Sequence, residues 1–218
     1  NVRDDRLFAH LARVTRSLPY NSFSGQHVAT ILNGYARAGV PSREVFEFMS
    51  TLLRYWDRFG QLTPSRLAPQ GVALILNAFA RAEVKDVDLF ERMARLVQLH
   101  LQSHADGPLH LVPSSTDAGE AGAVGASLPR PTLPAGPSAR RASMSPQAIS
   151  NIVNACANGD FKAPELLQTL EGAIVMFDGS SGMTLQHVSC IANGMVRLGH
   201  APPHLVSHLT KLARGMPR

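Results

Sequence analysis

One phrase of eight residues is written four times along this chain, and it constrains the fold more than any other feature. Each copy begins with glutamine, ends with asparagine and is largely aliphatic or small between them, at residues 26–33, 70–77, 147–154 and 186–193. Self-similarity with a period of about 40 residues is typical of proteins that stack one helical unit on the next. The repetition therefore predicts a helical array.

The apolar residues of each copy fall on one side of a helix. With the glutamine counted as position zero and about 100° of rotation per residue, positions two, five, six and nine lie opposite the glutamine. In the first copy these positions hold Val28, Ile31, Leu32 and Tyr35. The positions beside this face are small, with glycine or alanine at position eight, which predicts close packing of neighbouring helices.

The opposite side of the same helix carries three polar rows. They are the glutamine at position zero, the asparagine at position seven, and an arginine at position eleven that is replaced by asparagine in the third copy. The members of the rows are Gln26, Gln70, Gln147 and Gln186, then Asn33, Asn77, Asn154 and Asn193, and finally Arg37, Arg81, Asn158 and Arg197.

A second apolar helix is predicted after each phrase, over residues 43–57, 87–101, 164–176 and 203–214. Residues 4–16 read as the second helix of a unit whose first helix is missing. No segment alternates as a strand does, and no stretch is long and apolar enough to cross a membrane. The sequence predicts an all-α fold, a right-handed α-solenoid of about four and a half helix-turn-helix repeats.

The spacing of the four glutamines predicts an interruption of the array. It is 44, then 77, then 39 residues, and the long interval holds a segment rich in Ser, Pro, Gly and Ala at 103–143. Such a composition buries too little apolar surface to order itself. We expect helical repeats over 1–102, a disordered low-complexity insertion over 103–143, and two further helix pairs over 144–218.

Composition and side-chain patterns argue against an enzyme. The net charge is +5 with 17% charged residues, a weak attraction toward polyanions. Cys156 and Cys190 fall within predicted helices, which indicates neither a disulfide framework nor a thiolate metal site. His200, His204 and His208 are four apart, but prolines interrupt the first interval and no carboxylate is expected beside the others. We expect no catalytic residues, no metal and no cofactor.

The residues of 145–157, Ser-Pro-Gln-x-Ile-x-Asn-Ile-x-Asn-Ala-x-Ala, are echoed by residues 69–80. This pattern resembles the octotricopeptide repeats of algal organelles and the related heptatricopeptide repeats of apicomplexan mitochondria. The resemblance implies an α-solenoid that binds organellar RNA in transcript maturation, in translation or within a mitochondrial ribosome built on fragmented RNA. Family members often end in a nuclease-like RAP domain. The chain departs from them by ending at Arg218 without one, so the resemblance implies no catalysis. It departs again where asparagine at position seven replaces a large aromatic residue of the family.

Stacked first helices would place the three polar rows on one surface, where amides can bond to base edges and arginines to phosphates. The twelve residues of the rows are therefore the candidate RNA contacts. The favoured function is that of a structural subunit of the mitochondrial ribosome in the matrix, in contact with ribosomal RNA fragments and neighbouring proteins, with the plastid as the second choice of compartment. No membrane or small-molecule substrate is expected.

Two alternatives to this function stay open. The chain could be a free transcript-processing or translation factor, or a protein-binding scaffold of another organellar complex. The polar rows also have a purely structural interpretation. Glutamine near a helix start can satisfy backbone groups of a neighbouring unit, and an asparagine ladder can join one unit to the next. Repetition alone does not separate these possibilities, because a structural requirement also recurs in every repeat.

Overall fold

The protein is described by a computed structural model that covers residues 4–40, 42–102 and 144–216. These residues form nine α-helices and one short 3-10 helix, Tyr20–Ser22, and contain no strand. The predicted all-helical class is confirmed. The expected insertion at 103–143 lies outside the described residues. None of the described helices is both long and apolar enough to cross a membrane.

The helices alternate between two kinds, as the repeat predicts. Those that carry the phrase, called first helices below, are α2 (Gly25–Ala38), α4 (Pro69–Arg81), α6 (Pro146–Asn158) and α8 (Leu185–Arg197). The second helices are α1 (Asp5–Ser17), α3 (Arg43–Arg58), α5 (Val87–Gln102), α7 (Pro164–Val175) and α9 (Pro203–Arg214). The predicted bounds of the second helices agree with these to within one residue at each end.

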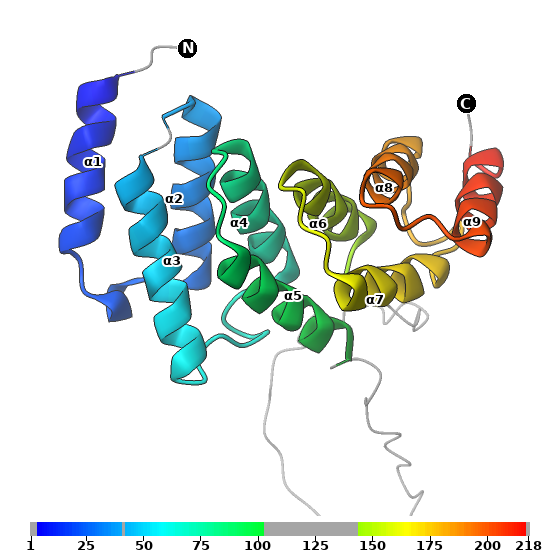
Figure 1. Ribbon diagram of the computed structural model, residues 1–218, viewed down its shortest axis with the longest axis horizontal. Coiled ribbons are helices and arrows are strands. Elements are labelled where there is room, and N and C mark those ends of the chain that lie inside the picture. Colours follow the sequence, from blue (N-terminus) through cyan, green and yellow to red (C-terminus); the bar gives the residue numbers. More distant parts are fainter. Residues whose placement is uncertain (1–3, 41, 103–143, 217–218) are drawn as a thin grey trace, which may run out of the picture.

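Each kind of helix stacks on its own kind and makes a layer. The first helices pack in the order α2, α4, α6 and α8, and the second helices in the order α1, α3, α5, α7 and α9. Figure 1 shows the pairs following one another along the long axis of the molecule. This arrangement is consistent with an α-solenoid.

The starts of the first helices explain why the phrase folds locally as a helix. Ser24, Ser145 and Thr184 each accept a hydrogen bond at the side chain from the backbone N–H three residues later, which satisfies a donor that the helix itself leaves free. Ala68 makes no such bond, but Pro69 follows it in the first turn, where proline is well tolerated.

The core lies between the two layers and is filled by the predicted apolar face. Aromatic pairs join the layers at phrase position nine, where Tyr35 meets Phe8 with 5.1 Å between ring centroids and Phe79 meets Phe46 with 5.0 Å. The third unit has Cys156 at this position. Burial raises the pKa of its thiol to about 12, so it stays protonated and packs as a small apolar group.

Close packing within the first-helix layer depends on small residues. A Cβ added to Gly194 of α8 would lie 2.5 Å from Cγ1 of Val153 in α6. Position eight of a first helix therefore packs on position six of the helix before it. Gly34 holds the same position in α2, where no first helix precedes among the described residues, and an added Cβ there meets nothing within 4 Å.

The N-terminal edge of the second-helix layer is left open. Leu7, Leu11 and Val14 lie on one face of α1 and are exposed by 51%, 41% and 42%. Their counterparts in α3 have the same spacing and are completely buried: Val45, Met49 and Leu52. Helix α1 is thus a second helix by pattern, and no first helix precedes it in the part of the chain that the structure describes.

Candidate nucleic-acid interface

The structure places all twelve candidate residues on the first-helix layer. The glutamines and the residues at position eleven are exposed on every first helix. The asparagines at position seven are half-buried in α2, α4 and α6 and exposed in α8. The rows are therefore accessible at their edges and partly recessed along the middle.

Hydrogen bonds between α6 and α8 fix how these rows run. Arg197 of α8 donates to Oδ1 of Asn158 at 2.9 Å and to the carbonyl oxygen of Ala157 at 3.1 Å. At the other end, Nε2 of His187 donates to Oε1 of Gln147 at 2.9 Å. Position eleven of α8 thus contacts position eleven of α6, and position one of α8 contacts position zero of α6. The two helices are parallel and in register, so each row continues from one helix to the next.

Gln147 is held in a short chain of hydrogen bonds. Nδ1 of His187 accepts the backbone N–H of Thr184 at 3.2 Å, which leaves the proton of a neutral imidazole on Nε2 and makes that atom the donor to Gln147. The amide nitrogen of Gln147 in turn donates to Oδ1 of Asn151 at 3.0 Å. Both ends of the Gln147 amide are occupied within the protein.

One asparagine of the middle row joins neighbouring helices. Nδ2 of Asn77 in α4 donates to the carbonyl oxygen of Ala73 at 3.0 Å and to that of Asn151 in α6 at 3.1 Å. Asn33, Asn154 and Asn193 make no side-chain hydrogen bond with any described residue. The structural ladder is therefore present at Asn77 and is not repeated at the other three positions.

Six exposed candidate side chains have no internal partner among the described residues. No hydrogen bond or ion pair there involves the side chains of Gln26, Gln70, Gln186, Asn193, Arg37 and Arg81, all of which are exposed. Two guanidinium groups and four amides are thus available to an outside ligand.

The charges of the two layers differ. The four first helices contain no aspartate or glutamate. In the second layer, by contrast, Arg54 of α3 pairs with Asp86 at 2.8 Å and with Asp88 at 2.9 Å, and Arg92 pairs with Asp88 at 3.1 Å. The hydrogen bond from Arg92 lowers the pKa of Asp88, with the nearby positive charges adding to the effect. The second layer neutralises much of its own charge, and the first layer does not.

The expectation that no carboxylate accompanies the C-terminal histidines is wrong. Glu171 of α7 faces the start of α9, where Nε2 of His204 lies 2.5 Å from one of its oxygens and His200 contacts the other. Burial alone would raise the pKa of Glu171, but the two histidines outweigh it and the pKa is lowered. The sequence could not reveal this contact because it joins different helices. Residues 4–40, 42–102 and 144–216 contain no group of three or more His, Cys, Asp or Glu side chains arranged to hold a metal ion.

Two residues that the sequence analysis passed over belong to this surface. His187 and Asn151 connect α6 to α8 and to α4, as described above. A signal for the histidine existed in the sequence. His187 follows Thr184 by three residues, as His27 follows Ser24, and both histidines complete a capping box by accepting the cap N–H.

Neither a model of a protein family nor a curated protein matches this chain.

Proposed function

We propose that this chain is a non-enzymatic RNA-binding helical-repeat protein, a right-handed α-solenoid whose first-helix layer holds an extended or irregular single strand. The observation that carries the proposal is the absence of carboxylates from all four first helices, together with the unpaired guanidinium groups of Arg37 and Arg81 among the described residues. A polyanion approaching this surface meets cations and amides without like charge on these helices.

The side chains of the surface suit RNA in two ways. Arginines near the ends of the first helices can neutralise phosphates, which gives affinity without sequence information. The free amides of Gln26, Gln70 and Gln186 can donate to and accept from the edges of unstacked bases, as single-stranded RNA recognition requires. The parallel register of α6 and α8 supports a continuous track of such groups across the layer.

Within this class, we propose a structural subunit of the mitochondrial ribosome that contacts ribosomal RNA fragments. The likeness of the phrase to organellar octotricopeptide and heptatricopeptide repeats favours a mitochondrial location over a cytosolic one. The mild net charge of +5 favours dependence on a large ribonucleoprotein over independent recognition of one transcript.

Sedimentation of the tagged protein from an organelle lysate, with and without RNase, tests the proposal when RNA crosslinked to the protein is sequenced. Movement with ribosomal subunits and crosslinks to ribosomal RNA are expected. A light, RNase-sensitive complex with one message would instead identify a transcript factor. The absence of any crosslinked RNA would contradict both roles.

A protein-binding scaffold is the second candidate, and one observation favours it. Gln147, Asn158 and Arg197 already have hydrogen-bond partners across α6 and α8, so these three side chains offer fewer free groups to RNA than the unpaired candidate residues do. Ionic strength separates the two functions, because RNA affinity falls steeply with salt and a mainly apolar protein interface does not.

A further inference from the structure

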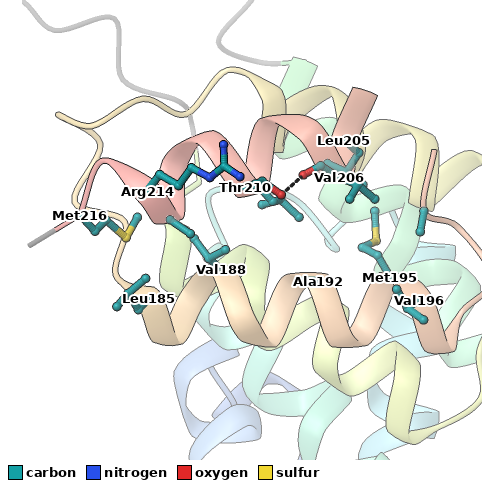
Figure 2. A pocket seen from close by; sticks show the side chains of 13 residues that line it. Leu185, Val188, Ala192, Met195, Val196, Leu205, Val206, Thr210, Arg214 and Met216 are labelled. Atoms are coloured by element: carbon teal, nitrogen blue, oxygen red, sulfur yellow. Dashed lines mark hydrogen bonds between the residues drawn. The ribbon is translucent and has the colours of Figure 1, made fainter. Parts of the chain in front are cut away.

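A groove of about 580 Å³ opens at the C-terminal end of the array, between α8 and α9. Figure 2 shows Leu185, Ala192 and Val196 along one wall, on α8, and Val206 on the opposite wall, on α9. Among the described residues its lining includes no acidic side chain, and Arg214 is the charged side chain at its edge.

The α8 wall of the groove is the face that the next helix covers elsewhere in the layer. Ala157 of α6, at phrase position ten, is 6% exposed, and Arg197 of α8 reaches its carbonyl oxygen. Val196 holds the same position in α8 and is 63% exposed. Leu185, just before the glutamine, is 45% exposed, whereas the corresponding Pro146 of α6 is buried. The groove therefore continues the interface through which each first helix receives its successor.

We propose that this groove binds one amphipathic helix of a partner protein, which packs on α8 as α8 packs on α6. The internal junctions define the chemistry of that helix. Position eight of the covering helix packs on position six of the covered one, as Gly194 does on Val153. Position six is Leu32 in α2 and Leu76 in α4, but it is Ala192 in α8. The partner helix therefore carries a Leu-sized side chain where the internal helices carry Gly or Ala.

Charge further defines the partner. Neither α8 nor α9 contains an aspartate or glutamate, and the last turn of α9 carries Lys211 and Arg214. Figure 2 shows Arg214 at the end of the groove where Leu185 lies. A helix parallel to α8 would place its first turn there. Carboxylates in that turn would be stabilised both by Arg214 and by the positive end of their own helix.

A second copy of this chain fits the groove poorly. Its free first-helix face is that of α2, where Gly34 would leave the space above Ala192 unfilled. Helix α1 also lies against α2, since the Tyr35 hydroxyl donates to the carbonyl oxygen of Phe8 at 2.9 Å. Docking α2 on α8 would bring α1 into the place held by α9. A foreign helix avoids both difficulties.

Fluorescence anisotropy with labelled peptides tests the proposal on the full chain. The probes are a peptide of residues 144–159 and the same peptide with Ala155→Leu, which puts leucine at position eight. We expect the leucine peptide to bind about tenfold more tightly, because it buries about three further methylene-sized groups and an isolated peptide realises part of that gain. Equal affinity of the two peptides, or no binding of either, would contradict the proposal.

Two groove variants and one control complete the experiment. Ala192→Leu fills the groove with the residue found in α2 and α4, and Val206→Asp puts a charge on its wall; each should weaken the leucine peptide at least about tenfold. Met176→Asp, at a position 75% exposed outside the groove, should leave affinity unchanged. Undiminished binding by both groove variants would overturn the proposal, as would self-association of the wild-type chain in sedimentation velocity that Val206→Asp abolishes. Val206 is not among the candidate RNA contacts, so unchanged RNA affinity of Val206→Asp keeps this test separate from that of the proposed function.

Discussion

The two layers of the molecule are joined by different chemistry. Between second helices the contacts include ion pairs: Arg16 of α1 with Glu44 of α3, and Arg54 of α3 with Asp86 at the start of α5. Between first helices they are glycine contacts and hydrogen bonds to neutral acceptors, such as Asn77 to the backbone of Asn151 and Arg197 to Asn158. Exposed ion pairs add little stability, so the difference matters more for where charge is left over than for how firmly the layers hold.

The difference in unpaired charge distinguishes the second layer, as a support, from the first layer, which we propose binds RNA. A cation that already faces a carboxylate has a reduced attraction for an outside anion, whereas Arg37 and Arg81 keep theirs in full. The second layer therefore resembles a self-neutralised scaffold, and the first layer supports the proposal of an RNA surface. Substitutions at equivalent positions of different repeats can test each part of this contrast, because they change the same atoms in different surroundings.

The largest effect is expected from the glycines at phrase position eight. Gly194→Ala should destabilise the protein by about 1–3 kcal/mol, since its Cβ would clash with Val153 and overpack the junction of α6 and α8. Gly34→Ala makes the same change where nothing lies within 4 Å, and should stabilise by up to about 1 kcal/mol through helix propensity. Urea denaturation measures both, and equal effects of the two variants would contradict the stacked arrangement of the first helices.

A smaller effect is expected from the asparagines at position seven. Asn77→Ala removes the hydrogen bond to the carbonyl of Asn151 and should cost about 1 kcal/mol more than Asn33→Ala, whose side chain has no partner among the described residues. Comparing the pair cancels the helix propensity of alanine. Thermal unfolding of the two variants side by side is sufficient, and a larger destabilisation by Asn33→Ala would refute the assignment of Asn77 as a structural link.

The smallest effect concerns Glu171, whose pKa is lowered in the folded protein by His200 and His204 against the opposing influence of burial. A group with a depressed folded pKa stabilises the fold above its unfolded pKa, and this stability disappears as the pH falls through the folded pKa. Near neutral pH, Glu171→Gln should therefore lower the free energy of unfolding by about 1 kcal/mol or less, and with it the melting temperature. In acid, where the carboxyl of the wild type is protonated in both the folded and the unfolded protein, the variant should be as stable as the wild type. A difference that persists unchanged in acid would show that packing, and not charge, is responsible.

Much of the fold could be predicted from the sequence, because the phrase recurs with the same apolar spacing in every copy. The apolar spacing located the helices, and the side chains of Ser24, Ser145 and Thr184 cap three of them. Those features are local, since caps and helix faces depend on residues within one or two turns of each other. The same regularity placed the twelve candidate residues on one layer.

The separate roles of equivalent residues could not be predicted. Asn77 and Asn33 hold the same position in the phrase, yet Asn77 has α6 beside it with the carbonyl of Asn151 in reach. The contact of Glu171 with His200 and His204 likewise joins residues about thirty positions apart on different helices. Such contacts depend on how the units pack against one another. The repeated pattern is shared by all units, so it does not specify the individual contacts between them.

The salt dependence of RNA binding tests the central claim most directly. Affinity for a labelled single-stranded RNA would be measured over a range of salt for the wild type, for R37Q/R81Q in the first layer and for R43Q/R58Q in the second, two pairs that remove the same charge. If Arg37 and Arg81 neutralise phosphates, R37Q/R81Q should make the slope of log affinity against log salt less steep, by about 0.7 for each phosphate that the variant no longer neutralises. The slope of R43Q/R58Q should stay near that of the wild type. Equal reductions of the slope in the two variants, or a greater reduction from the second layer, would contradict the assignment of the first-helix layer as the RNA-binding surface.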